Sequence, residues 1–282
     1  MRYLILGGGL IASELIAKIR HGDYLLLSRS VAGGSGAIRH DFEWNARFPD
    51  VAYEFSPDVV INTVWNEVGN YSDENNSRNH NIQKKIIQAL CVFGERKRII
   101  NMGSCWEFAN SGSNNVFLSK QQKNFVETKL TVKNEFSHVF GNLSIWAIVY
   151  YVYAKNAKKG LLKYVMESIA NGHDIYLEKP NMLVDYIHVA DVANAILELC
   201  TYGDLSEVHL GTGLGYTAKQ FIDEVVDIVC LKKRTPHVRF TEGTLKETLI
   251  ADTTAVSDMK WFRSKLSLSS GLSDCTKLSI KS

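Results

Sequence analysis

A glycine-rich turn near the start of the chain has the spacing of a dinucleotide-binding fingerprint. Gly7, Gly9 and Ala12 follow the pattern G-x-G-x-x-A directly after a short apolar run. The first glycine permits a tight turn, the second lets the backbone approach a pyrophosphate, and the small third residue lets a helix pack closely on a strand. Phosphates are favoured at a helix N-terminus. We therefore expect dinucleotide contacts from Gly7, Gly9, Leu10, Ile11 and Ala12.

The residues after the next apolar run indicate which dinucleotide is bound. Ser28 and Arg29 stand where an acidic residue would bond the ribose hydroxyls of NAD(H) and repel a 2′-phosphate. A hydroxyl followed by a guanidinium suits a phosphate instead. The sequence therefore predicts NADP(H) rather than NAD(H) as the cofactor.

A parallel sheet would position these residues. Apolar runs that could form strands lie at 2–6, 24–27, 59–64, 98–102 and 143–150, and helical patterns lie at 10–20, 81–93 and 125–140. This alternation predicts an α/β fold with a doubly wound parallel Rossmann sheet. After Tyr153 the runs become shorter and the pattern changes. We predict a dinucleotide-binding Rossmann domain over 1–153, with a returning segment near 183–202, and a smaller C-terminal α/β lobe over 154–282.

The composition argues against several classes of partner. The 282 residues are 45% hydrophobic and 22% charged, with a net charge of +2, which gives no strong field for nucleic acid or a membrane surface. No apolar stretch reaches the roughly 18–20 residues of a membrane span. The five cysteines are scattered and form no zinc-type pair, which suits a reducing compartment. We expect a cytoplasmic protein without a metal.

Six further segments carry motifs that are weak one by one, but their order and spacing together are specific to one protein family. They are SPDVVIN at 56–62, NHN at 79–81, IINMGS at 99–104, VDYIHVADVA at 184–193, LGTGLGYT at 210–217, and AD at 251–252 followed by KW and SGL within 260–272. Together with the glycine turn they resemble the extended short-chain dehydrogenase/reductases. That family contains nucleotide-sugar epimerases, dehydratases and 4-keto reductases, and the resemblance runs nearly end to end.

The resemblance implies roles for individual residues. Ser104 takes the position of the family's hydroxyl that bonds the reacting sugar oxygen. Lys129 takes the lysine of the family's YxxxK motif, which binds the nicotinamide ribose and lowers the pKa of the motif's tyrosine. Further dinucleotide contacts would come from Thr63 and Tyr150. Substrate contacts would come from Ser104, Cys105, Trp106, Tyr151 and Lys246, and the C-terminal lobe would bind a nucleotide sugar.

One catalytic position departs from the family pattern. The tyrosine of YxxxK should be residue 125, and the chain has Phe125. Phenylalanine keeps the ring and loses the proton donor, and such acid–base help is typically worth about 10²- to 10⁴-fold in rate. A literal YxxxK at 151–155 lies outside the expected catalytic helix. Three explanations are open: an engineered trap, a natural enzyme that uses Ser104, water or another tyrosine, or a protein that binds dinucleotide without turnover.

The residues after Ser104 bear on the reaction. The family's 4,6-dehydratases place an Asp-Glu pair there, whereas this chain has Cys105 and Trp106. Glu107 is one place further on, and we expect it to point away. The resemblance therefore implies NADP(H)-dependent reduction of a 4-keto deoxy nucleotide sugar, in the synthesis of surface-polysaccharide sugars. A nucleotide-sugar epimerase and a silent dinucleotide-binding protein are the alternatives. The family also implies a homodimer through the helices near 82–93 and 125–140.

Overall fold

The chain divides into two compact units. The computed structural model describes residues 1–30, 36–93, 97–177, 181–201, 205–229, 237–240, 247–253 and 264–276. Unit 1 comprises Met1–Glu107, Leu118–Ile148 and Ala193–Val208. Unit 2 comprises Phe108–Phe117, Val149–Val192 and His209–Ser282.

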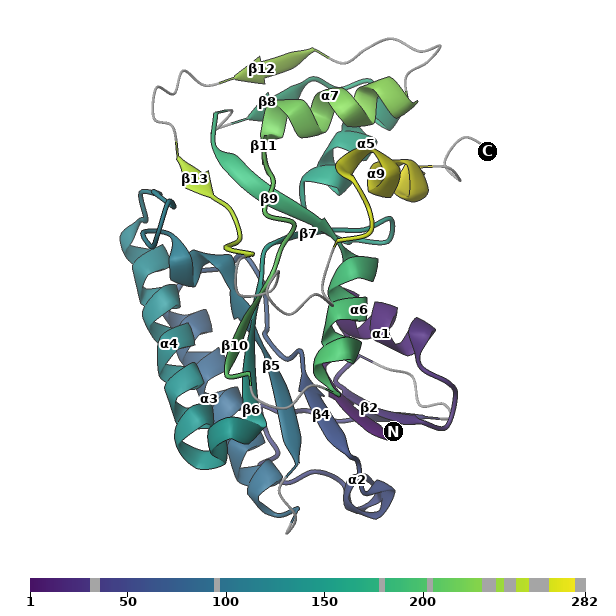
Figure 1. The fold of residues 1–282 in the computed structure, drawn as a ribbon, viewed down its shortest axis with the longest axis vertical. Helices are drawn as coiled ribbons and strands as arrows, with labels where there is room; N and C mark the ends of the chain where they lie inside the picture. Colours follow the sequence, from purple (N-terminus) through teal and green to yellow (C-terminus); the bar gives the residue numbers. More distant parts are fainter. Residues whose placement is uncertain are drawn as a thin grey trace. The chain divides into compact units, whose positions relative to one another are not determined.

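A seven-stranded sheet forms the centre of unit 1 (Figure 1). Its strands are β1 (Tyr3–Leu6), β2 (Tyr24–Ser28), β3 (Ala37–Arg39), β4 (Val59–Asn62), β5 (Arg98–Ser104), β6 (Ser144–Val149) and β10 (Glu207–Leu210). The strand order is β10-β6-β5-β4-β1-β2-β3, and β1 pairs in parallel with both β2 and β4. The pairs β2–β3 and β4–β5 are parallel too. This is the 3-2-1-4-5-6 order of dinucleotide-binding folds, so the predicted doubly wound Rossmann sheet is confirmed.

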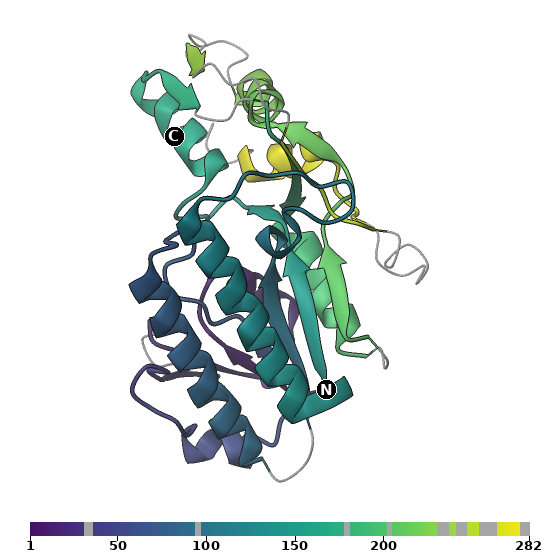
Figure 2. The same cartoon turned by 90° about the vertical axis from the view of Figure 1, so that its left-hand side faces the viewer.

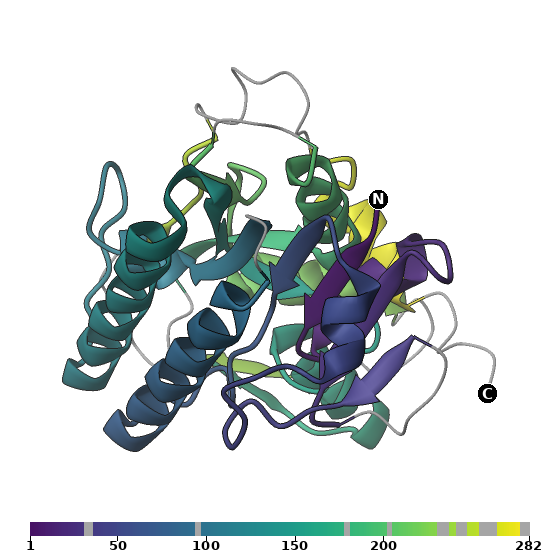
Figure 3. The same ribbon diagram turned by 90° about the horizontal axis from the view of Figure 1, so that it is seen from below.

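Helices cover both faces of this sheet. They are α1 (Leu10–Lys18), α2 (Asp50–Phe55), α3 (Asp73–Cys91) and α4 (Lys120–Phe140), with α6 (Val189–Leu199) beginning in unit 2 and ending in unit 1. Short 3-10 helices, η1 (Cys105–Phe108) and η2 (Gly141–Leu143), precede and follow α4 along the chain. Figures 1 and 2 show α3 and α4 side by side on one face, and Figure 3 shows α1 on the other. The core strands are almost entirely buried because both faces are covered.

Two helices begin earlier than the apolar pattern predicts. α3 begins at Asp73 rather than at 81, because the Ser72 side chain caps it by accepting a bond from the Asn75 amide. α4 begins at Lys120 rather than at 125, where Ser119 and Gln122 form a reciprocal capping box. Both first turns are polar, so apolar periodicity alone does not reveal them.

Unit 2 is built around the strand β9 (Leu183–His188). It pairs in parallel with β7 (Tyr151–Tyr153) and β13 (Thr248–Leu249), and antiparallel with β11 (Gly215–Thr217). The remaining elements are β8 (Ile175–Leu177), β12 (Val238–Phe240), α5 (Leu161–Asn171), α7 (Ala218–Val229) and α9 (Leu268–Thr276). No helix in the described part of either unit is long and apolar enough to cross a membrane.

Candidate active site

The glycine turn joins β1 to α1, and each of its three glycines meets a different environment. Gly7 has a φ of +92°, and a Cβ there would lie 2.9 Å from the Thr63 hydroxyl oxygen. A Cβ on Gly8 would lie 2.4 Å from Ser28 Oγ. A Cβ on Gly9 would meet nothing within 4 Å. Gly7 and Gly8 therefore let the turn pack against the ends of β4 and β2, while Gly9 borders open space.

The open side of this turn fits a dinucleotide pyrophosphate. Helix α1 begins at Leu10 directly after Gly9, and no side chain caps its first amides. Uncapped amides at a helix start attract phosphate oxygens, and the missing Cβ at Gly9 allows close approach. Ala12 is fully buried against the sheet, as the small third residue of the fingerprint requires. The sequence did not assign a role to Gly8, although the run of three glycines was a visible signal.

Three residues predicted at the dinucleotide site lie around this turn in different ways. Ser28 is buried under Gly8, and its hydroxyl accepts a bond from the Ser30 amide. The Thr63 hydroxyl donates to the Leu6 carbonyl at 2.9 Å, so it holds the turn against β4. Arg29 is exposed directly after β2. Of these three, Arg29 has the side chain that is free to meet a phosphate in solvent.

The partly buried carboxylate of Glu107 follows the end of β5, next to the predicted catalytic hydroxyl. The Ser104 amide donates to Glu107 Oε1 at 2.6 Å, and the indole of Trp146 donates to Glu107 Oε2 at 2.8 Å. Ser104 Oγ accepts a longer bond, 3.4 Å, from the Trp106 amide. The prediction that Glu107 points away is wrong. Helix η1 has about three residues per turn, so the third residue after Ser104 folds back over it.

Lys129 lies beneath this segment with its ammonium enclosed. Its Nζ donates to the Met102 carbonyl at 2.9 Å and lies 3.6 Å from the ring centroid of Trp65. Burial lowers the pKa of Lys129 to about 8, against the opposing effect of the Glu107 charge. Burial likewise raises the pKa of Glu107, and the Lys129 charge opposes that rise. The protonation states of the two groups therefore depend on one another.

Phe125 belongs to a group of four rings, Trp65, Tyr71, Trp106 and Phe125, which we call the aromatic cluster. The Phe125 ring is buried, and its centroid lies 5.7 Å from that of Trp65 and 5.0 Å from that of Tyr71. The Tyr71 and Trp106 centroids are 6.3 Å apart. Trp65 and Tyr71 were not predicted as site residues. Their position after the β4 strand was the available signal, since ligands bind beyond the carboxyl ends of parallel strands.

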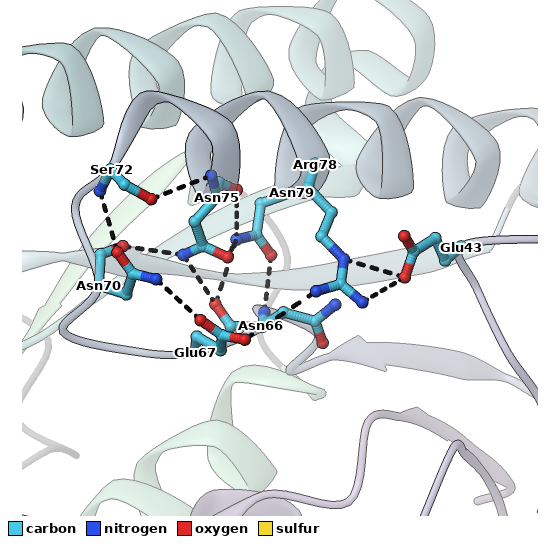
Figure 4. Close-up of polar contacts among 8 residues, drawn as sticks. All are labelled: Glu43, Asn66, Glu67, Asn70, Ser72, Asn75, Arg78 and Asn79. Carbon is cyan, nitrogen blue, oxygen red and sulfur yellow. Dashed lines mark hydrogen bonds and ion pairs between the residues drawn. The ribbon is translucent and has the colours of Figure 1, made fainter.

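Asparagines fix the loop between β4 and α3 that carries Trp65 and Tyr71 (Figure 4). Asn79 accepts from the Asn66 amide at 2.6 Å and donates to the Asn66 carbonyl at 3.1 Å. Asn75 donates to the Asn70 carbonyl at 2.8 Å. Arg78 pairs with Glu43 on one side and approaches Glu67 on the other. The loop is thus held by side chains of α3.

The remaining predicted substrate and cofactor residues have the following places. Cys105 is buried at the start of η1 and Trp106 is partly exposed beside it, both in unit 1. In unit 2, the buried Tyr150 shares a hydrogen bond with His209 Nδ1 at 3.0 Å. The ring of Tyr151 lies 5.9 Å from that of Tyr186. Lys246 is outside the described residues.

The structure of unit 1 brings Ser104, Cys105, Trp106, Phe125 and Lys129 together at the end of β5. It adds Glu107, Trp65 and Tyr71 to them. This arrangement offers a serine hydroxyl, a phenol and a buried ammonium whose charge is coupled to that of a partly buried carboxylate. Such groups can bind a carbonyl oxygen and move a proton to it.

Comparisons with known proteins identify the family and agree with this fold. A family model described as the NAD dependent epimerase/dehydratase family matches residues 3–209. The chain is 25% identical over 252 residues to a CDP-abequose synthase from Yersinia pseudotuberculosis, covering 80% of this chain and 85% of that protein.

Solved structures give the same fold. A UDP-glucose 4-epimerase from Thermotoga maritima, crystallised with UDP-glucose, matches with a TM-score of 0.78 and 16% identity, covering 99% of both chains. A GDP-mannoheptose C4 reductase from Campylobacter jejuni with NADP bound matches with a TM-score of 0.75 and 16% identity, covering 98% of this chain and 97% of that one.

Proposed function

Because the chain belongs to the NAD dependent epimerase/dehydratase family, we propose that it reduces the 4-keto group of a deoxy nucleotide sugar with NADPH. The observation that carries this proposal is the end of β5. There the Ser104 hydroxyl is followed by Cys105 and Trp106, and the Glu107 carboxylate is occupied by the Ser104 amide and the Trp146 indole. Elimination of water needs a free acid–base pair at this place, whereas carbonyl reduction needs only an oxygen-binding group and a proton donor.

The names of similar proteins also favour reduction of a nucleotide sugar. The sequence relative is a CDP-abequose synthase, and one structural neighbour is a nucleotide-sugar C4 reductase with NADP bound. The substrate named for that neighbour, GDP-mannoheptose, is a sugar carried on a nucleoside diphosphate. A pyrimidine nucleotide on the sugar is the choice that the sequence relative favours, and we propose CDP- or dTDP-linked substrates of deoxysugar synthesis.

The glycine turn and Arg29 would hold the dinucleotide, which supplies the hydride when bound. The amides at the start of α1 would bind the pyrophosphate beside Gly9, and the exposed Arg29 guanidinium would bind the 2′-phosphate that distinguishes NADP(H) from NAD(H). Ser104 Oγ donates to the keto oxygen of the sugar and so orients it. The Lys129 ammonium, held on the Met102 carbonyl, supplies positive charge near the end of β5 when it is protonated, which favours negative charge as it develops on that oxygen.

Phe125 favours a second candidate, dinucleotide binding without turnover. The ring at this position has no ionisable hydroxyl, so the acid–base group implied by the family is missing from α4. An epimerase on the same scaffold would also need proton transfer at this oxygen. A homodimer through α3 and α4 and a cytoplasmic location stay predictions.

One experiment separates these candidates. The purified chain is mixed with NADPH or NADH and with CDP- or dTDP-4-keto-6-deoxyglucose, and dinucleotide oxidation, product and binding are measured. The reductase proposal expects NADPH oxidation and a 4-hydroxy product. Tight NADPH binding without oxidation on any of these sugars would leave the silent binder, and interconversion of 4-hydroxy sugars without net oxidation would identify an epimerase.

Arg29→Ala tests the choice of dinucleotide. We expect it to weaken NADPH binding about tenfold or more and to leave NADH binding nearly unchanged, because one charge-assisted phosphate contact is worth about 1.5–3 kcal/mol. Arg20→Ala removes another exposed arginine of the same βαβ segment and serves as the matched control. Equal weakening of both dinucleotides by Arg29→Ala would contradict the NADP(H) preference.

A further inference from the structure

Tyr71 places a phenol hydroxyl inside the aromatic cluster. The other three rings of the cluster, those of Trp65, Trp106 and Phe125, carry no group that can act as an acid near neutral pH. The Tyr71 ring lies 5.0 Å from the Phe125 ring, inclined at 61° to it. A phenol is therefore present next to the ring that lacks one.

The surroundings of the Tyr71 hydroxyl tie it to the predicted substrate position. The Trp106 side chain hydrogen-bonds to this hydroxyl, and the Cys105 thiol lies close enough to influence it electrostatically. Cys105 and Trp106 directly follow Ser104 on β5 and η1. An indole N–H can only donate, so the Tyr71 oxygen accepts this bond and keeps its own proton for another acceptor.

The loop geometry holds Tyr71 in this place. Ser72 caps α3 immediately after it, and Asn76 donates to the Tyr71 carbonyl at 3.2 Å. Asn75 and Asn79 bond to the backbone of Asn70 and Asn66 in the same loop (Figure 4). A preorganised donor costs no rearrangement when the reaction occurs, which is a property of effective catalytic groups.

We propose that Tyr71 is the proton donor of the proposed reduction, in place of the hydroxyl that Phe125 lacks. The proposal rests on the proposed function. The keto carbon gains a C–H bond from the hydride of NADPH, and the electron pair of the C=O π bond moves to oxygen. That oxygen takes the proton from Tyr71 Oη, and the phenolate regains a proton from water. Burial raises the pKa of Tyr71, so the hydroxyl carries its proton near neutral pH and has one to give.

The kinetic test uses three variants. Tyr71→Phe removes the hydroxyl and keeps the ring, and we expect kcat to fall about 10²- to 10⁴-fold with KM nearly unchanged. Adding Phe125→Tyr to this variant should restore at least a tenth of the lost rate, because it puts a phenol on the neighbouring ring. Tyr3→Phe is the matched control, since Tyr3 is also a phenol whose pKa burial raises in unit 1. A Tyr71→Phe enzyme within about threefold of the parent would overturn the proposal.

A second measurement does not depend on turnover. The ultraviolet absorbance of tyrosinate is followed against pH for the parent chain and for Tyr71→Phe, and the difference isolates the ionisation of Tyr71. We expect NADP⁺ together with CDP-glucose to shift this ionisation and to leave the corresponding Tyr3 difference unchanged. If neither sugar is reduced but the shift occurs, the proposed function fails while Tyr71 still faces the ligand. If both probes bind and the ionisation of Tyr71 does not move, the proposal is overturned.

Discussion

Each unit holds a carboxylate whose pKa burial raises, Glu107 in unit 1 and Asp185 in unit 2, and the two charges are compensated in different ways. In unit 1, Glu107 accepts bonds from the Ser104 amide and the Trp146 indole and is influenced by the Lys129 charge. In unit 2, Asp185 accepts from the amide and hydroxyl of Thr212 and from two further amides, those of Gly213 and Ala251. Burial is the main cause of a raised pKa in both carboxyls.

The two carboxylates differ in the groups that oppose the effect of burial on their pKa values. Backbone amides around Asp185 are fixed dipoles that do not titrate, and the hydrogen bonds that Asp185 accepts from them hold the turn at 211–213. Lys129 is itself a titratable group, so the charge state of Glu107 follows that of its partner. The fixed arrangement suits a structural role, and the coupled arrangement suits a site where charge must change during a reaction.

The largest expected effect tests the structural role of Asp185. Asp185→Ala leaves the backbone amides of Thr212, Gly213 and Ala251 without the carboxylate that accepts their hydrogen bonds. Each unsatisfied buried donor costs about 1–3 kcal/mol. We expect a loss of about 4 kcal/mol in the free energy of unfolding, measured in urea. Asp223→Ala removes an exposed carboxylate of unit 2 and should change it by less than about 0.5 kcal/mol. Equal stability of the two variants would show that the bonds to Asp185 contribute nothing.

The next effect tests the titration of the buried lysine. Lys129 has a pKa of about 8 when folded and its usual 10.5 when unfolded, so between these values the unfolded chain binds more protons. Stability from this group is therefore complete above about pH 10.5 and is lost as the pH falls through about 8. Lys129→Met removes this contribution to the pH dependence of the free energy of unfolding. The parent should gain up to ~3 kcal/mol relative to that variant from pH 8 to pH 10.5.

The comparison with the Met variant cancels other groups that titrate at high pH. Tyr153 and Tyr186 have raised pKa values and act in the opposite sense, but they are present in both proteins. Lys123→Met changes an exposed lysine of the same helix and should show the pH dependence of the parent. A parent and a Lys129→Met variant with parallel pH profiles would mean that Lys129 titrates normally.

The sequence predicted the glycine turn and the sheet well, because both are local patterns. A G-x-G-x-x-A turn between an apolar run and a helical pattern specifies its own strand and helix. The segments 184–193 and 210–217 were also found, but as separate motifs. The structure shows that they form one feature, since Asp185 of the first accepts amides of the second, and Gly211 must lack a Cβ to let Asp185 and Ala251 approach.

Glu107 and Tyr71 show what could not be predicted from the sequence. The direction of Glu107 depends on three residues of 3-10 helix, which turn its side chain back over Ser104. Tyr71 reaches Phe125 because amides on α3 hold a loop whose path has no periodic pattern. The direction of a side chain after a strand and the path of a loop both depend on individual side-chain-to-backbone hydrogen bonds. Alternating apolar runs do not encode them.

The smallest effect returns to the carboxylate of unit 1. Glu107→Gln keeps one oxygen for the Ser104 amide but presents an NH₂ group to the donating Trp146 indole, so one hydrogen bond is lost at about 1–2 kcal/mol. It also removes the charge that raises the pKa of Lys129, so that pKa should fall below about 8. Glu127→Gln on the exposed side of α4 should change neither quantity.

Nuclear magnetic resonance of lysine side chains labelled with ¹⁵N measures this shift directly. If the Lys129 pKa stays at its parent value in Glu107→Gln, the carboxylate and the lysine are not coupled, and Glu107 resembles Asp185 after all. If it falls, the pH range over which the fold loses stability from Lys129 extends to lower pH, because its lower edge is the folded pKa while its upper edge, the unfolded pKa, does not change. The charge under Ser104 would then be set by Glu107, and the rate of the proposed reduction should change its pH dependence in the same direction.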